Sequence, residues 1–411
     1  MKRGFLMAGI LFSAPHRVMF GLGALQSLFS ILFWSVDLGG RHAGLYGAIA
    51  WSLPPVWLHG ALMLYGLFPA FIFGFLMTAL PKWVSAPALS RQQFLPAFGF
   101  MAGGWALFWL GLWWAPAAGS GMLLATLGWA WGVCGLWRAV TWPQPSGLAV
   151  DRSHAWAILG ALVLGALGQL AYGAGLLLGK TMAVRSGIEL GLWGCLLPMF
   201  FIVSHRMLPF FTGAVLKGYR VYRPMAPLWW VLACFLAHAL FSLAGWKAAL
   251  WLPDGVAALV VFHFSWKWQL QRSFAVPMLA MLHGATLWLG LGLALYAAQS
   301  LALLLGYHFA SLAPLHAITI GYFASMVLGM VTRVTLGHSG RPISAGDQTT
   351  WPLFWLFQSV PLLRIAAEFY PLPGVANLQW LATLLWLLVF ALWVRRHGWM
   401  YLRPRPDGQA G

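Results

Sequence analysis

The sequence predicts an all-α, polytopic membrane protein, built as a bundle of about 12 transmembrane helices. Three observations support this fold class. Of the 411 residues, 61% are hydrophobic and only 8% are charged, whereas soluble domains carry about 25% charged residues. Apolar runs close to the ~20 residues that cross a bilayer recur along the whole chain. The Lys and Arg residues behind the formal net charge of +17 lie almost entirely between those runs.

The predicted spans follow one another so closely that residues 1–411 are expected to form a single transmembrane domain. Pro54-Pro55 separates the first span from the second, and Pro143-Gln144-Pro145 separates the fourth from the fifth, because proline interrupts a helix. Pro253-Asp254-Gly255 is a further predicted break, at the start of the eighth span, which is the shortest. The spans are roughly 18–36, 56–80, 94–114, 119–137, 155–178, 188–208, 227–245, 249–265, 275–297, 313–332, 351–371 and 376–394.

The positive charges assign an orientation to these spans. With a cytoplasmic N-terminus, nineteen of the 24 Lys and Arg residues fall on the cytoplasmic side and four on the other, with Arg364 inside a span. Cytoplasmic loops carry such an excess of positive charge, so both termini are expected in the cytoplasm. The same distribution argues against nucleic acid as a partner and favours membrane lipid.

Twelve histidines are many for a chain with so few polar residues. Eight of them lie in or against spans, where ionisable side chains are rare and tend to be functional. At about 1.5 Å rise per residue, His59 and His316 both fall about one turn below the outer interface. His238 is expected in the outer half and His283 nearer the middle. The inner face is expected to hold His16, His205, His263 and His338, and the solvated loops His42, His154, His308 and His397.

Three of these histidines share a local pattern in which a small residue follows the imidazole directly. The pattern occurs in Leu58-His59-Gly60, Leu282-His283-Gly284 and Leu315-His316-Ala317. A flat macrocycle bound through histidine needs clearance for its ring, and neutral imidazole is a common axial ligand of haem iron that also suits copper. The pattern therefore predicts metal ligation, with a hydrogen-bonded structural histidine as the alternative.

Other polar residues in or near the spans have two readings each. Arg364 and Glu368 are spaced i, i+4 and can pair on one helix face, either as a structural ion pair or as a partner for haem propionates or a proton entry point. Glu189 opens the sixth span on the outer side, as a structural residue or a proton relay. Asp37 and Asp254 are expected to lie in loops.

The longer motifs resemble the NnrS family of bacterial membrane proteins. The most specific motif contains His316, Arg333, His338 and Arg341, because their separation is long and distinctive. The resemblance implies a protein of the bacterial inner membrane that binds haem and copper and acts in nitric oxide metabolism. The stretches that carry the resemblance are "HGALMLYG…FIFGFLMTALPKW" (59–83), "HRMLPFFTG" (205–213), "MLHGATLWLGLGLAL" (281–295) and "LHAITIGYFASMVLGMVTRVTLGHSGRP" (315–342).

The resemblance also carries functional positions over, with one departure. Typical members have a second histidine followed by glutamate just after the position of His59, where this chain has Ala61 and Leu62. In exchange this chain has His16 and His205, so a metal ligand is expected to have moved to the inner face. The positions that match the family motifs are His59, His283, His316, His338, Arg206, Arg333 and Arg341.

Three functions follow as hypotheses. In the first, His59 and His316 hold a haem, expected to be b-type, while His283 or His238 holds a second haem or copper. Such a protein would reduce nitric oxide to nitrous oxide with electrons from quinol, through a proton path chosen from Glu189, Glu368 and Tyr65. The second hypothesis is a haem or copper protein that binds nitric oxide or handles metal without catalysis. The third is a cofactor-free transporter.

The polar residues of the inner face keep two interpretations. They form either a site for a second haem, a quinone head or an anion, or a positively charged rim that fixes the topology. The residues concerned are His16, His205, Arg206, His338 and Arg341, with Arg333 in part an anchor of the same kind.

Overall fold

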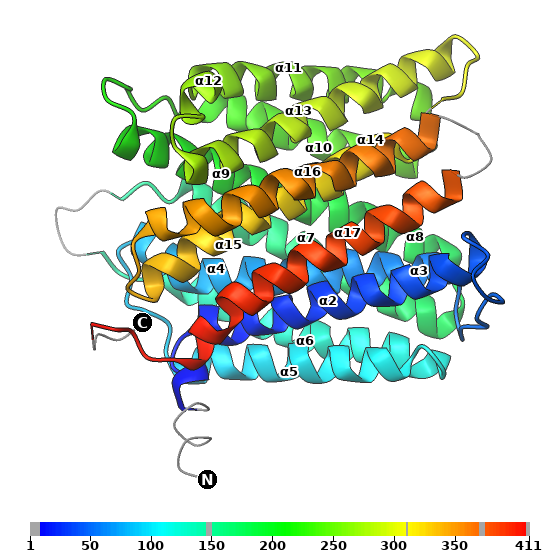
Figure 1. Cartoon of the computed structure of the whole chain (residues 1–411), viewed down its shortest axis with the longest axis horizontal. Coiled ribbons are helices and arrows are strands. Elements are labelled where there is room, and N and C mark those ends of the chain that lie inside the picture. The colour runs from blue at the N-terminus through cyan, green and yellow to red at the C-terminus, as the bar shows by residue number, and fades with distance from the viewer. Residues whose placement is uncertain (1–8, 145–149, 310, 370–374, 408–411) are drawn as a thin grey trace.

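A computed structural model describes residues 9–144, 150–309, 311–369 and 375–407. Over these residues the chain folds into helices that run side by side along one direction, and no β-strand occurs among them (Figure 1). Pro145 of the predicted break and the end of the predicted span 351–371 lie outside the described residues. The all-α polytopic fold class is thereby confirmed.

The first half of the bundle contains two helices that are each interrupted by a π-helical stretch. Its elements are α2 (Pro15–Arg41), α3 (Pro55–Ala61), η1 (Leu62–Leu67), α4 (Phe68–Trp83), α5 (Arg91–Leu110), α6 (Ala115–Val140), α7 (Ser153–Leu178), α8 (Thr181–Glu189), η2 (Leu190–Leu196) and α9 (Leu197–Val215).

The second half contains one more interrupted helix and closes the bundle. Its elements are α10 (Met225–Leu243), η3 (Lys247–Ala249), α11 (Trp251–Lys267), α12 (Leu270–Ser273), α13 (Pro277–Leu304), α14 (Ala313–His316), η4 (Ala317–Ala324), α15 (Ser325–His338), η5 (Ile343–Gly346), α16 (Asp347–Phe369), α17 (Val375–His397) and η6 (Gly398–Leu402).

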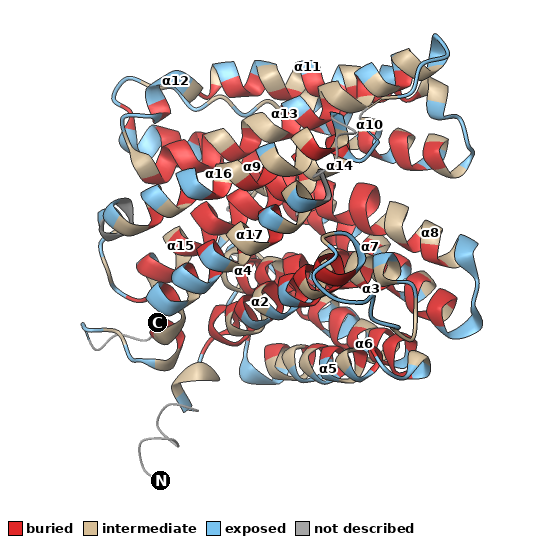
Figure 2. Ribbon diagram, turned by 45° about the vertical axis from the view of Figure 1, so that its right-hand side comes forward, coloured by how far each residue is buried: buried red, intermediate tan, exposed pale blue. Residues whose placement is uncertain are grey.

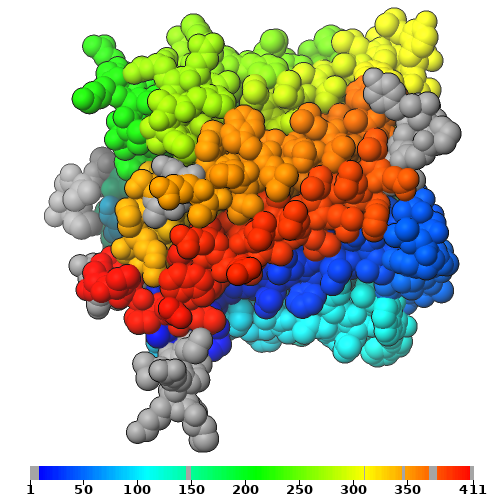
Figure 3. Space-filling model, viewed as in Figure 1, coloured from blue at the N-terminus to red at the C-terminus, as the bar shows by residue number. Residues whose placement is uncertain are grey.

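Within the described residues, 11 helices are long and apolar enough to cross a membrane. The predicted span that is missing from these 11 is the eleventh, 351–371, which corresponds to α16; this helix has 23 residues but carries Gln358, Arg364 and Glu368. These side chains lower its apolarity below that of the others. Figure 3 nevertheless shows α16 beside α17 on one face of the bundle, where Trp355 and Leu362 are exposed. Exposed apolar side chains on a transmembrane bundle face lipid, so α16 lies among the spans.

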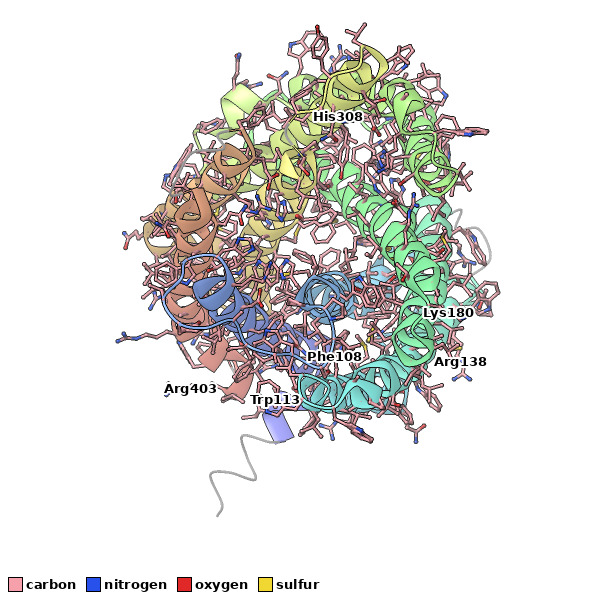
Figure 4. The ribbon with its side chains drawn as sticks, turned by 90° about the vertical axis from the view of Figure 1, so that its right-hand side faces the viewer. Phe108, Trp113, Arg138, Lys180, His308 and Arg403 are labelled. Atoms are coloured by element: carbon pink, nitrogen blue, oxygen red, sulfur yellow. The ribbon has the colours of Figure 1, made fainter. Side chains whose placement is uncertain are left out.

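Three spans form the centre of the bundle. In Pro55–Trp83 and Ala313–His338, 83% of the most apolar 18-residue window is buried, and in Thr181–Val215 the share is 72%. Figure 2 shows α4, α9 and α15 largely buried, whereas α5 and α11 at the edges are more exposed. Figure 4 looks along the helices and shows them arranged around a central region. A helix that is buried on all sides can direct polar side chains only at other helices, so these three spans are where an internal site is expected.

The three central spans are also the ones that contain π-helical stretches, η1, η2 and η4. A π-helical turn is rare and occurs frequently at functional sites, because it adds a residue and redirects the side chains before it. His59 lies three residues before η1, and His316 lies directly before η4. The backbone irregularity therefore coincides with the two histidines predicted at equal depth.

Glycines bring α5 and α6 into backbone contact. A Cβ on Gly104 would lie 2.5 Å from the carbonyl oxygen of Gly121 and 2.5 Å from the backbone nitrogen of Ala125. A Cβ on Gly128 would lie 2.6 Å from the carbonyl oxygen of Ala97. Small residues permit this close approach. The van der Waals packing that results holds helices together in lipid, where no hydrophobic effect acts between them.

The two ends of the described chain meet at one side of the bundle (Figure 1). Arg17 at the start of α2 is only 3% exposed, and its Nη1 donates to the carbonyl oxygens of Tyr401 at 3.1 Å and Arg403 at 2.9 Å. A third carbonyl, that of Met400, lies 3.3 Å away. Arg17 therefore fastens the segment after α17 to the first span, in keeping with termini on the same side.

Candidate functional site

A cavity of about 250 Å³ lies in the part of the bundle where α3, α14 and the start of α17 come together. One water requires about 10–15 Å³, so the cavity has room for a ligand of many atoms. Most of its wall is apolar, and α2, α3, η1, α8, η2, α14, η4, α16 and α17 all contribute to it. The polar side chains on the wall are Trp34, His59, His316, Thr319, Arg364, Gln379, Thr383 and Trp386.

His59 enters the cavity wall from the last turn of α3. Its ring stacks on Trp34 of α2 with centroids 4.0 Å apart and planes at 15°, so the imidazole is held flat against an indole. Its Nδ1 is buried without a hydrogen-bond partner among the described residues. Trp386 has a buried Nε1 on the same wall that also has no partner there. A buried polar atom without a partner is costly, so the wall is suited to a ligand that supplies one.

His316 lines the same cavity from the end of α14. Its Nδ1 lies 2.9 Å from the carbonyl oxygen of Leu312. A carbonyl only accepts, so Nδ1 carries the proton and the lone pair of the neutral ring is on Nε2. Metal-binding histidines are commonly oriented by a bond of this kind from the other ring nitrogen. The structure therefore prepares Nε2 of His316 for ligation.

An ion pair supports the backbone around His316. Arg364 pairs with Glu368 one turn further along α16, and both side chains are nearly buried. The other carboxylate oxygen of Glu368 accepts a hydrogen bond of 3.1 Å from the backbone N–H of Leu312. The Leu312 carbonyl in turn orients His316. The Arg364–Glu368 ion pair therefore positions His316 indirectly, through the backbone of Leu312. Arg364 itself lies on the cavity wall.

The small residues after the predicted ligands do not act as the sequence suggested. Only Gly60 lies on the cavity wall. A Cβ there would lie 2.9 Å from the hydroxyl of Tyr172, so Gly60 also allows close packing of α3 on α7. Ala317 is buried in the bundle, and a Cβ on Gly284 would make ordinary contact with Phe354 at 3.6 Å. Clearance for a ring is therefore a property of Gly60 alone.

His238 and His283 do not come together. His283 is 1% exposed, and its Nε2 lies 3.1 Å from the hydroxyl of Thr212 on α9. His238 on α10 packs against Tyr296, which lies thirteen residues beyond His283 on α13. At 1.5 Å per residue the two histidines are about 20 Å apart in depth. The structure thus offers no shared metal site from this pair, and neither residue lines the cavity.

The inner-face histidines separate into pairs. His16 and His338 have ring centroids 4.7 Å apart and line a second, small space of about 10 Å³ with Arg17. His205 is instead bonded to His154, with 3.0 Å between His205 Nδ1 and His154 Nε2. Among the described residues, His205 and His338 thus have different histidine partners. Among the described residues, no three His, Cys, Asp or Glu side chains gather so that they could hold a metal ion.

The predicted inner-face arginines lie over aromatic rings. Each guanidinium carbon is within 5 Å of a ring centroid, a distance at which the cation is attracted to the face of the ring. These contacts fit the anchoring interpretation of the arginines. The pairs are Arg206 over Trp83 at 4.7 Å, Arg333 over Phe211 at 3.9 Å and Arg341 over Trp399 at 4.7 Å.

The candidates for a proton path occupy different places. Glu368 adjoins the cavity through Arg364 and Leu312. Tyr65 is buried and donates to the carbonyl oxygen of Gly187 at 2.5 Å, away from the cavity wall. Glu189 accepts a 2.6 Å hydrogen bond from Ser242, and its neighbour Ile188 lines the cavity.

Four residues that the sequence assigned to solvent or loops are buried. One is His397, which ends α17, is 1% exposed and has its Nδ1 3.1 Å from the carbonyl oxygen of Trp393. His154 opens α7 and is 1% exposed, Asp254 lies in the first turn of α11 and is 1% exposed, and Asp37 in α2 is 3% exposed. Asp37 accepts hydrogen bonds from Arg41 and from Trp51. In the sequence, each of these residues lies at the edge of an apolar run, and that position was the one indication that it could be buried.

His42 follows α2 beside this ion pair. Its Nε2 lies 2.7 Å from a nitrogen of the Arg41 guanidinium. Partial burial is the larger cause that lowers the pKa of His42 below its ordinary value, and the positive charge of Arg41 is the next. His42 is therefore a neutral hydrogen-bond acceptor for Arg41 at neutral pH.

The fold and the cavity define a class: a polytopic helical membrane protein with an internal cavity lined by two imidazoles and an arginine. A family model described as NnrS protein matches residues 10–405, which is nearly the whole chain. The chain belongs to the NnrS family, and the resemblance seen in its motifs is confirmed. No curated protein matches it significantly. Membership makes it a membrane protein of the nitric oxide response.

Proposed function

We propose that the chain binds haem in the cavity between His59 and His316 and reduces nitric oxide to nitrous oxide there. The single observation that carries this proposal is that two histidines from spans far apart in sequence line one cavity. The wall fits haem in three respects: its volume, the unpartnered polar atoms of His59 and Trp386, and the prepared Nε2 of His316. When bound, haem supplies a redox-active iron with affinity for nitric oxide.

The residues around the cavity have separate tasks in this proposal. His59 and His316 would hold the iron in the resting protein, one of them would yield its position to nitric oxide, and Trp34 fixes the ring of His59 by stacking. Arg364 provides a positive charge on the wall for the propionate groups. The remaining apolar wall excludes water, which strengthens these electrostatic contacts. Two molecules of nitric oxide, two electrons and two protons give one nitrous oxide and one water, with quinol from the bilayer as the electron donor.

A second function shares the same ligands. In it the protein binds nitric oxide, or handles copper, and thereby protects other iron proteins without turnover. The observation that favours it is that Tyr65 and Glu189 are hydrogen-bonded to groups outside the cavity wall. Turnover needs a proton supply, whereas binding alone does not.

Optical spectra of the purified protein, oxidised and then reduced with dithionite, test the haem site. We expect a b-type haem spectrum that is lost or converted to a single-histidine form in His59→Ala and in His316→Ala. His263→Ala is the matched control, because His263 pairs with Tyr222 at 3.2 Å and does not line the cavity. A wild-type protein without pigment, or alanine variants with unchanged spectra, would contradict the assignment.

Anaerobic assay with reduced quinol and nitric oxide then separates the two functions. Nitrous oxide formation above the rate of the buffer, lost in His316→Ala, supports reduction. A haem-loaded protein that binds nitric oxide but releases no nitrous oxide supports the protective function and overturns the first.

A further inference from the structure

A second buried polar cluster lies on the other side of the helix that borders the cavity. Ile188 and Leu192 line the cavity, whereas the residues that follow each of them, Glu189 and Trp193, contact α10. Successive helical residues point about 100° apart. The segment formed by α8 and η2 is therefore all that separates the cluster from the cavity.

Two contacts, one helical turn apart, join the segment formed by α8 and η2 to α10. Ser242 donates a hydrogen bond of 2.6 Å to Glu189, and the ring of His238 stacks on Trp193 with centroids 3.4 Å apart and planes at 15°. Because both pairs are spaced by four residues along their helices, Glu189 and His238 lie on the facing sides of neighbouring helices.

His238 is paired with a carboxylate from a third helix. Its Nδ1 lies 2.8 Å and 3.0 Å from the two carboxylate oxygens of Asp254 on α11, and the residues are 3% and 1% exposed. Nδ1 donates to Asp254, so Nε2 is the nitrogen left to exchange a proton. Ionisable residues inside a membrane are costly and mark ion or proton pathways. A His–Asp pair at this depth therefore calls for a function.

The carboxylate of Glu189 is only half satisfied. Its Oε1 accepts from Ser242, but Oε2 is buried with no hydrogen-bond partner among the described residues. The guanidinium of Arg185, one turn earlier, donates to the backbone carbonyl of Ser242 and not to this carboxylate. A buried carboxylate oxygen without a donor is costly unless it receives a proton.

We propose that Glu189, His238 and Asp254 form a proton-binding site that passes protons from the outer face to the cavity. The destination of the protons rests on the proposed reduction of nitric oxide, whereas the site itself does not. A proton from water adds to His238 Nε2 or to Glu189 Oε2, crosses beside Ile188 and is consumed with an electron in the cavity. The three side chains then return to their starting protonation states, because the cycle transfers only protons and forms no bond between heavy atoms.

The charged surroundings of the cluster come from four elements. Arg185 on α8 and Lys247 on η3 contribute positive charge, and Cys234 on α10 and Tyr296 on α13 are the other titratable groups that face it. Asp37 on α2 offers a contrast, since its buried carboxylate is paired with the permanently charged Arg41. Asp254 has a histidine as partner, the one side chain that exchanges a proton near neutral pH.

Infrared difference spectra of the purified protein between acidic and alkaline buffers test the site without requiring haem. We expect a protonated-carboxyl band that appears at low pH, shifts in D₂O and is lost or displaced in Glu189→Gln, Asp254→Asn and His238→Gln. Asp37→Asn is the matched control and leaves the band in place. Glu189→Asp retains a displaced band, which separates loss of the carboxyl from loss of the fold.

Identical spectra in wild type and all three variants would overturn the site. The route to the cavity is tested by nitrous oxide formation, which we expect to fall about 100-fold in Glu189→Gln, the contribution typical of a proton-transfer group. Equal rates in wild type and Glu189→Gln would overturn the route. A wild type that forms no nitrous oxide refutes the proposed reduction, and the infrared result then decides the site alone.

Discussion

At the scale of single residues, the sequence predicted the cavity better than the clusters around it. The span boundaries and the helical rise alone predict that His59 and His316 lie at equal depth. Both histidines line one cavity in the structure. Asp254 was assigned to a loop because Pro253-Asp254-Gly255 resembles a turn. Proline is tolerated in the first turn of a helix, so the same three residues begin α11 instead. The pairing of Asp254 with His238 depends on how α10 and α11 pack together, which no local sequence pattern predicts.

Glu368 gives a residue-scale prediction, because it joins Arg364 to the backbone at Leu312. Glu368→Gln leaves a nearly buried guanidinium without its counter-charge, which costs about 3–5 kcal/mol. We expect a lower temperature of thermal unfolding in detergent and a changed spectrum of any haem bound at His316. The control is Asp407→Asn, which removes a more exposed partner of Arg405. Equal effects of the two substitutions would show that burial does not matter at Glu368.

At the scale of helices, span positions followed from composition, but the π-helical stretches η1, η2 and η4 did not. Apolar periodicity records which residues are buried and not whether a backbone N–H bonds four or five residues back. In the most buried spans apolar residues occupy every face of the helix, so the inserted residue leaves no clear trace in the apolar pattern. The orientation of His316 relative to α15 could therefore not be derived from the sequence.

Deletion of Ile320 from η4 tests the role of that stretch. Removal of one residue rotates His316 by about 100° relative to α15, and we expect loss of haem binding while the helix content by circular dichroism is unchanged. Deletion of His308, an exposed loop residue, is the control and should leave binding intact. Normal haem binding after the Ile320 deletion would mean that the π-helical turn does not position the histidine.

The contact between α5 and α6 gives a second prediction at this scale. Gly104→Ala introduces a Cβ 2.5 Å from two backbone atoms, and backbone cannot move aside as a side chain can. Overpacking of this kind costs about 1–3 kcal/mol. Gly103→Ala next to it meets only Leu124 at 3.9 Å and serves as the control. We expect reduced thermal stability for Gly104→Ala alone, and equal stability of both variants would contradict the backbone contact.

At the scale of the whole molecule, the distribution of positive charge predicts which side of the membrane each loop occupies. Tyr307 and Val221 lie between helices and are 70% and 58% exposed, on opposite sides in the predicted orientation. In a chain without its native cysteines, Tyr307→Cys should react with an impermeant thiol reagent in right-side-out vesicles. Val221→Cys should react only after permeabilisation. The reverse pattern would invert the orientation, and labelling of both would reject it.

The fastening of Arg17 to carbonyl groups beyond residue 399 has a consequence for biogenesis. A ribosome releases Arg17 nearly 400 residues before the acceptors of its hydrogen bonds. Throughout synthesis the guanidinium must stay at the lipid headgroups or in contact with water, because no partner for it exists yet. The first span can therefore settle into its final position only after residue 403 has left the ribosome, later than the spans that lie between the two partners.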